Sequence, residues 1–223
     1  GLMPGTLIDA VIADAASKNI RPDLMPEFLE AMKKGATSQS ENSNYGRRGT
    51  KDYLKLGYVP LTHHESVNHT LDYAFSDYCI SQVAKQTGDK EISDFYAHQA
   101  KDYQNIFDSE TGFMRAKDAD GNFRPDFLDI RWGRDYAEGS AWQTSWSVLH
   151  DFAGLIKLHG SRENFENKLI ELCNQRPNFN VEGYGFEIHE MSEMAAIEFG
   201  QVTISNQPSF HYPYLFSYIG KPW

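Results

Sequence analysis

The sequence predicts an all-α protein made of antiparallel helix pairs, arranged in a ring or a stack. Apolar residues recur at three- and four-residue spacing through most of the 223 residues, which is the period of one helix face. No strand-like alternation persists for more than five residues. Short turns alternate with long polar loops, as is typical of antiparallel helix pairs. With 40% apolar and 23% charged residues, the chain has the composition of a globular protein with a buried core.

About eight helices are expected, and several of their ends carry recognisable signals. Asp89 and Ser161 are expected to cap the helices that follow them, and Gly88 to end the helix before it. Residues 36–65 are expected to form a binding loop, because a structureless stretch of that length is uncommon in a helical domain. A second irregular stretch covers residues 108–137. The expected helices are 7–17, 22–35, 66–87, 90–107, 141–158, 162–173, 190–199 and 208–220.

Charge and cysteine content exclude several classes of protein. Lys and Arg number 21 and Asp and Glu 31, so the net charge is −10. A surface this acidic repels phosphate backbones, which argues against nucleic acid as the partner. No apolar stretch approaches the roughly 18 residues that span a bilayer, so no transmembrane segment is expected. Cys79 and Cys173 fall in apolar helical patterns and are expected to be buried free thiols, since two cysteines make neither a disulfide framework nor a four-thiolate zinc site.

Glu138 is the first candidate for chemistry. It stands at a loop-to-helix junction, followed by Trp142, Gln143 and Trp146. A carboxylic acid packed against aromatic rings loses hydration, so its pKa rises and it can donate a proton. Tryptophan faces bind sugar rings, and glutamine supplies a paired donor and acceptor. The alternative is structural: a carboxylate that favours a helix N-terminus, with core tryptophans behind it.

Two further stretches carry oxygen ligands. His189-Glu190-Met191-Ser192-Glu193 is similar to a zinc-protease motif, but Glu193 stands in place of the second histidine, so a zinc site is excluded. The remaining imidazole and two carboxylates suit a hard cation such as calcium, or form a solvated helix start. Asn206 and Gln207 precede Pro208 at another helix start. Capping explains part of that pattern, and amide oxygens also bind calcium or sugar hydroxyls.

Three weaker patterns are expected to be structural. Asp118–Asn122 is expected to form a tight turn, because its glycine comes too early for an EF-hand and no glutamate closes the loop. The stretch 63–65 is expected to be a loop. Arg47 and Arg48 could bind an anion, but a lone basic pair is expected on the surface. No nucleophile elbow, phosphate loop or dinucleotide fingerprint is present in the sequence.

The stretch Tyr136–Gln143 resembles the Glu-Gly-Asn-Ala-Trp-Gln segment of glycoside hydrolase family 92, the calcium-dependent exo-α-mannosidases. Further motifs of the family follow in the right order along the chain. Ser140 and Ser205 stand where many members carry Asn and Gly, and Phe210 replaces a common polar residue, so fine specificity is left open. The other matching stretches are Met3–Thr6, Gly57–Pro60, His189–Ala195, Ser205–Pro208 and Tyr218–Trp223.

The resemblance implies a fold and an activity. Members of the family pair a β-sandwich with an (α/α)6 barrel and invert the anomeric carbon. Residues 1–223 resemble only the central part of the barrel, so the chain is expected to be a partial (α/α)6 barrel that lacks the sandwich and the later barrel helices. The expected function is part of an inverting exo-α-mannosidase acting on terminal α-mannosides of glycans, with the isolated fragment inactive.

The resemblance also assigns roles to residues. Glu138 matches the general acid, with Trp142 and Gln143 as substrate-binding neighbours. His189 and Glu190 match a pair that holds the leaving sugar in members selective for α-1,2 linkages. The calcium site is expected near Glu193, Asn206 and Gln207. The aspartate base is expected in a later segment, beyond this chain.

Two other functions compete with this assignment. One is a non-catalytic sugar-binding or scaffolding helical domain, in which Glu138 is structural. The other is an unrelated helical-toroid enzyme, such as a polysaccharide lyase, which would use a Tyr or His base. The family implies a periplasmic or secreted bacterial protein, although residues 1–4 do not start a signal peptide. The sequence determines neither the linkage nor the oligomeric state.

Overall fold

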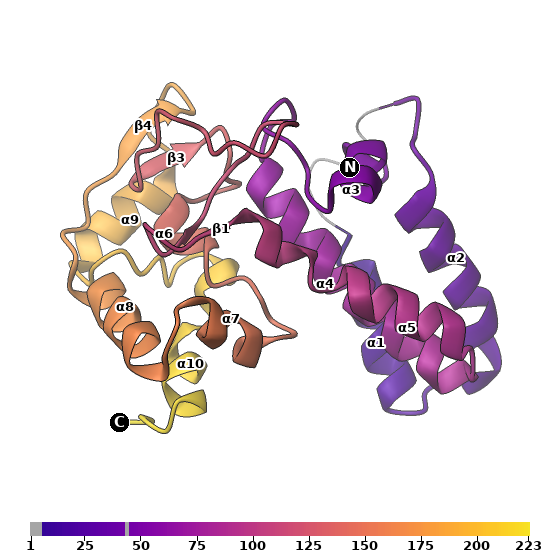
Figure 1. Ribbon diagram of the computed structural model, residues 1–223. Helices are drawn as coiled ribbons and strands as arrows, with labels where there is room; N and C mark the ends of the chain where they lie inside the picture. Colours follow the sequence, from indigo (N-terminus) through magenta and orange to yellow (C-terminus); the bar gives the residue numbers. More distant parts are fainter. Residues whose placement is uncertain (1–5, 43–44) are drawn as a thin grey trace. The chain divides into compact units, whose positions relative to one another are not determined.

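The computed structural model describes residues 6–42 and 45–223 and is predominantly helical, which confirms the predicted fold class (Figure 1). Of the family-like stretch Met3–Thr6, the first three residues lie outside the described part. The chain divides into two units. The first comprises residues up to Ile106 together with Lys117–Asn122, and the second comprises Phe107–Ala116 and Phe123–Trp223.

The first unit is organised around one long helix, α4, against which α1, α2 and α5 pack. Its α-helices are α1 (Ile8–Ser17), α2 (Met25–Thr37), α3 (Thr50–Leu56), α4 (Ser66–Thr87) and α5 (Lys90–Gln99), with short 3₁₀ helices at Pro22–Leu24 and Asp102–Ile106. Asp89 caps α5 by accepting a hydrogen bond from the amide of Ile92, as predicted. Gly88 ends α4 at φ 85°, a left-handed conformation that glycine adopts without strain.

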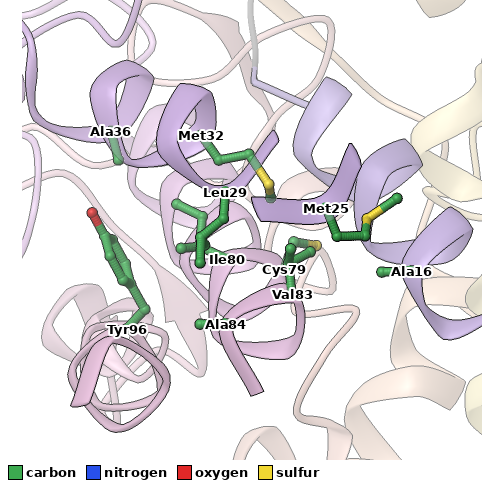
Figure 2. Packing of buried hydrophobic residues seen from close by; sticks show 10 residues of the cluster. All are labelled: Ala16, Met25, Leu29, Met32, Ala36, Cys79, Ile80, Val83, Ala84 and Tyr96. Carbon is green, nitrogen blue, oxygen red and sulfur yellow. The ribbon is translucent and has the colours of Figure 1, made fainter. Parts of the chain in front are cut away.

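A cluster of ten buried residues from four helices forms the core of this unit (Figure 2). Cys79 lies inside it as a free thiol, whereas Cys173 in the second unit is only half-buried. The core therefore contains side chains from both ends of the unit's sequence. The cluster comprises Ala16, Met25, Leu29, Met32, Ala36, Cys79, Ile80, Val83, Ala84 and Tyr96.

Two expectations for the stretch after α2 were wrong. The helix α2 runs past Gly35 to Thr37, because Gly35 keeps a helical conformation and does not provide the left-handed turn that ends a helix. The polar stretch 36–65 also contains α3, which is only seven residues long and ends at Gly57 with φ 73°. Such a short helix shows little periodicity in the sequence.

Arg47, expected on the surface, is buried instead. Its guanidinium Nη1 lies 2.7 Å from Asp77 of α4, and its Nη2 lies 4.0 Å from Asp9 of α1. The guanidinium also lies 5.0 Å from the ring centre of Tyr73, in a cation–π contact. Arg47 therefore ties the polar loop to two helices. The turn predicted at Asp118–Asn122 is confirmed, with the Asp118 carboxylate accepting from the amides of Asp120 and Asn122.

The second unit contains shorter elements. Its strands pair as β1 with β2, antiparallel, and β3 with β4, parallel. The strands have two to four residues each, too few for an alternating pattern to be recognised. The elements are β1 (Phe107–Asp108), β2 (Phe113–Met114), β3 (Arg131–Gly133), α6 (Ala141–Thr144), α7 (Phe152–Leu158), α8 (Arg162–Asn174), β4 (Asn180–Gly183), α9 (His189–Ile197), a 3₁₀ helix at Gln207–Ser209, and α10 (Tyr212–Tyr218).

The helix predicted at 141–158 is broken into α6 and α7. Side chains occupy the backbone carbonyls that a continuous helix would use for its own amides. Trp146 Nε1 donates to the carbonyl of Trp142 at 2.7 Å, and the Tyr212 hydroxyl donates to that of Gln143. Asp151 then starts α7 by accepting from the amide of Gly154. The predicted helices 90–107 and 208–220 are also interrupted, each containing an α-helix and a separate 3₁₀ turn.

The remaining helices match their predictions closely. Ser161 caps α8 by accepting from the amide of Asn164, and α9 begins one residue before the expected start. Across residues 6–42 and 45–223, we find no helix with both the length and the apolar character needed to cross a membrane.

Candidate active site

Glu138 lies in the loop that joins β3 to α6, two residues before the helix N-cap. Ser140 caps α6: its Oγ accepts from the amide of Trp142 at 3.2 Å. Gln143 Oε1 accepts in return from the amide of Ser140 at 2.8 Å, which completes a capping box. The predicted junction between loop and helix is therefore confirmed, and the capping box fixes the start of α6.

The backbone of Glu138 has an unusual conformation. Its φ is 48°, in the left-handed region that residues other than glycine rarely adopt. The Glu138 amide donates to the hydroxyl of Tyr184 at 2.8 Å. Asn206 Nδ2 donates to the Glu138 carboxylate Oε2 at 3.2 Å and lies 3.5 Å from its carbonyl oxygen. Tyr184 thus contacts the backbone of Glu138, and Asn206 contacts its carboxylate and lies beside its carbonyl oxygen.

Two glycines allow Tyr184 to approach this loop. A Cβ on Gly133 would lie 2.8 Å from the Tyr184 ring, and one on Gly183 would lie 2.0 Å from the carbonyl oxygen of Trp132. Any side chain at either position would push β3 and β4 apart. The glycines therefore permit the strand pairing that brings Tyr184 to Glu138.

Trp142 and Gln143 lie in the core, 2% and 3% exposed. Trp142 Nε1 donates to Asp129 at 3.0 Å, and Phe113 packs edge-to-face against the indole. Gln143 Nε2 donates to the carbonyl of Gln201 at 2.7 Å. Because these contacts occupy the faces and polar atoms of both side chains, the structure favours a supporting role over the direct sugar contact that the sequence predicts.

His189 begins α9 and projects into solvent, with 75% of its side chain exposed. Its Nε2 lies 3.1 Å from Glu190 and its Nδ1 lies 3.2 Å from Glu193. A hydrogen bond from the Ser205 side chain, and a second from His189, hold the pKa of Glu193 below its usual value despite the opposing effect of burial. One imidazole and two carboxylates thus form a small polar cluster.

The polar cluster and Glu138 belong to one place in the fold. Ser205 contacts Glu193, and its neighbour Asn206 contacts Glu138. Three stretches that are widely separated in the sequence are therefore connected through the segment before α10. Gln207 is exposed at the first position of the 3₁₀ helix in that segment. Tyr184 joins the site as a residue for which the sequence carried no signal beyond two flanking glycines.

Three aspartates that precede Glu138 in the sequence, Asp126, Asp129 and Asp135, are each engaged by another side chain. Arg124 binds both oxygens of Asp135 at 2.8 Å, and Arg134 binds Asp126 at 2.8 Å. Asp129 accepts from Trp142, as described above. None of the three is thus presented as a second catalytic carboxylate.

The residues expected to bind calcium have suitable chemistry but form a partial set. Glu193 offers a carboxylate, and Asn206 and Gln207 offer amide oxygens, which are ligands for hard cations. Calcium takes six to eight oxygens. Within the described ranges, no group of three or more His, Cys, Asp or Glu side chains is placed to hold a metal ion. These three residues therefore fit a share of a calcium site.

The geometry defines a helical domain that gathers carboxylates, amides and an imidazole at one site, the groups that hydrogen-bond hydroxyl-rich ligands. All 223 residues match the model of the glycosyl hydrolase family 92 catalytic domain. The chain belongs to this family, and the predicted resemblance is confirmed.

Solved structures and a curated relative agree with this family assignment. The chain is 40% identical to a family GH92 inverting mannosidase from Bacteroides thetaiotaomicron, with a TM-score of 0.86, over 100% of this chain and 30% of that one. It is 31% identical, with a TM-score of 0.84, to a GH92 α-mannosidase of the same organism in complex with mannoimidazole, over 100% of this chain and 28% of that one. An uncharacterized secreted glycosidase from Arthroderma benhamiae is 25% identical, over 98% of this chain and 29% of its own length. The chain thus spans less than a third of each relative.

Proposed function

We propose that this chain forms the acid side of the active site in an inverting exo-α-mannosidase that removes terminal α-mannosides from glycans. The observation that carries the proposal is the contact from Asn206 to the carboxylate of Glu138, beside the cluster of His189, Glu190 and Glu193. Family membership supports it, as do the similarities to an inverting mannosidase and an α-mannosidase.

In this mechanism Glu138 is the general acid. Its carboxylic acid proton moves to the glycosidic oxygen as the bond to the anomeric carbon breaks, and the shortened glycan leaves. Water attacks the opposite face of the mannose ring and loses its proton to a second carboxylate. Inversion requires the two carboxyl groups to lie roughly 6.5–9.5 Å apart. That base belongs to a part of the parent protein outside this chain.

The exposed His189 and the half-buried Glu190 beside it are proposed to bind the leaving sugar, with α-1,2-linked mannosides as the first substrates to test. Calcium is proposed to be held in part by Glu193, Asn206 and Gln207. When bound, it would supply positive charge that orients the hydroxyls of the mannose ring.

We further propose that residues 1–223 are a fragment of an (α/α)6 catalytic domain, completed by other parts of the parent protein. A periplasmic or secreted location is proposed for that protein, consistent with the secreted relative.

Replacing the acid tests the function. In the full-length protein, Glu138→Gln should slow hydrolysis of a mannobiose by about 10²–10⁴. An aryl mannoside with a good leaving group needs less protonation and should lose much less. The matched control is Glu198→Gln, an exposed glutamate that shares the left-handed backbone of Glu138. Equal losses on both substrates would contradict the acid role. An unchanged rate would favour the non-catalytic sugar-binding domain.

A further inference from the structure

We propose that Tyr184 is a positioning residue for Glu138, holding the acid loop in its left-handed conformation through the bond from the Glu138 amide to the Tyr184 hydroxyl. The inference rests on the proposed function, since it assigns how the acid is aimed. Tyr184 comes 46 residues after Glu138 and is not among the residues that the family motifs indicate.

The conformation of Glu138 explains why such a partner is needed. At φ 48° the Cβ crowds the backbone, so the peptide favours other conformations unless its groups are held. The amide must also find an acceptor, because an unpaired, partly buried N–H is costly. The Tyr184 oxygen accepts that hydrogen bond at 2.8 Å. Losing this bond would leave the loop free to relax.

The ring of Tyr184 is anchored independently of its hydroxyl. It packs against a buried cluster of Trp132, Met191 and Met194 and lies over Gly133, where no side chain would fit. A phenylalanine at position 184 would keep these contacts. Tyr184→Phe therefore removes the hydroxyl and leaves the packing in place.

Asn206 is the second side chain that contacts Glu138. Its Nδ2 faces two acceptors, the carbonyl oxygen and the carboxylate Oε2 of Glu138. A backbone carbonyl always accepts, so the amide nitrogen must point toward Glu138. Tyr184 thus binds the Glu138 amide at 2.8 Å, while Asn206 binds the carboxylate at 3.2 Å and lies 3.5 Å from the carbonyl oxygen. A small rotation of the loop would point the Glu138 carboxyl group in a different direction.

The test uses Tyr184→Phe in the full-length protein. Misplacing a catalytic group by about 1 Å can cost on the order of 10²-fold, and we expect a loss of about tenfold in kcat on a mannobiose for the milder change here. An aryl mannoside with a good leaving group should lose less than about threefold, with KM unchanged for both. The matched control is Tyr58→Phe, which removes a hydroxyl bonded to the carbonyl of Asp118.

A double variant separates positioning from other roles. In the Glu138→Gln background, Tyr184→Phe should cause less than about a twofold further loss, because the group that it positions is already gone. A full tenfold further loss would overturn the proposal. Equal losses by Tyr184→Phe on the two substrates would also overturn it. The same holds if these losses accompany a fall in the melting temperature of Tyr184→Phe that is larger than that of Tyr58→Phe. If Glu138→Gln alone shows no leaving-group dependence, the proposed function fails first, and the two failures are distinguishable.

Discussion

The imidazole of His189 is exposed to solvent, and both of its ring nitrogens lie beside carboxylates. The proposed function assigns this exposed imidazole, together with Glu190, to the leaving sugar. In the full-length protein, replacing His189 and Glu190 by alanine should therefore weaken hydrolysis of a disaccharide more than that of a small artificial mannoside. Steady-state kinetics on the two substrates measures the difference.

The control for that pair is His98→Ala, an exposed histidine in α5. Calcium affinity should be measured for the same variants. If it falls sharply while both substrates lose activity alike, His189 and Glu190 belong to the metal site.

Asp9 carries a pH dependence that the sequence did not predict. Burial raises its pKa to about 6, although Arg47 acts in the opposite direction. A raised pKa means that the folded protein holds this proton more tightly than the unfolded chain does. The contribution of protonated Asp9 to the free energy of unfolding is therefore full below about pH 3.8 and is lost as the pH rises through about 6. The free energy of unfolding of Asp9→Asn, relative to that of the unsubstituted protein, should therefore rise by about 2 kcal/mol between pH 4 and pH 7.

Urea unfolding at the two pH values measures this change. Asp14→Asn, on the solvent side of the same helix, is the matched control. A constant difference in unfolding free energy between Asp9→Asn and the unsubstituted protein at both pH values would contradict the raised pKa.

At this scale the sequence identified residue types better than their surroundings. Glu138, His189, Glu193 and Asn206 stood in short motifs, and the structure connects them in one site. The burial of the tryptophan and glutamine that follow Glu138 was not visible, because a short motif does not show which side of a helix faces the core. Tyr184 was missed because its contact with Glu138 crosses 46 residues.

Among the elements, the one-turn helix α6 is held at its N-terminus by Gln143. Gln143 closes the capping box and bonds the carbonyl of Gln201. Gln143→Leu keeps the size of the side chain but leaves buried polar partners unpaired, so it should destabilise the full-length protein by about 2–3 kcal/mol. Thermal or urea unfolding measures the loss.

The same variant separates two roles of Gln143. A direct sugar contact would raise KM and leave stability unchanged. Gln175→Leu, which removes a hydrogen bond from Gln175 Nε2 to the Glu171 carboxylate, is the matched control for replacing a glutamine.

Helix prediction succeeded where local signals decide and failed where distant side chains intervene. The long helix α4 and the caps at Asp89 and Ser161 were confirmed, because periodicity and capping act within a few residues. The break between α6 and α7 was not predictable, since Tyr212 bonds a carbonyl of α6 from 69 residues away. Periodicity records which residues are apolar and carries no information about such competition for carbonyls.

For the molecule as a whole, we predict that the 223 residues alone fold helically but do not hydrolyse a mannobiose, even with excess calcium. Asp126, Asp129 and Asp135, which precede Glu138 in the sequence, are bound to other side chains, and removing the base typically costs about 10²–10⁴ or more in rate. Turnover comparable to that of the full-length protein would contradict this and would assign the base to one of these aspartates.

The isolated chain should also self-associate. Leu7, Ile8 and Val11 at the start of α1 are 52%, 66% and 64% exposed, and exposed apolar patches drive association. Size-exclusion chromatography over a range of concentrations measures this, and a strictly monomeric chain would contradict it. Matched serine substitutions at Ile8 and Val11 should reduce the association.

The contacts of Glu138 also impose an order in time. The side chains that hold it are synthesised 46 and 68 residues after it. At about 5–20 residues per second, the ribosome reaches Asn206 roughly 3–14 s after Glu138. During that interval the nascent polypeptide carries Glu138 without the full set of side chains that contact it in the folded protein. Any product that terminates before Asn206 would contain the sequence motif around Glu138 and lack the contact from Asn206 to its carboxylate.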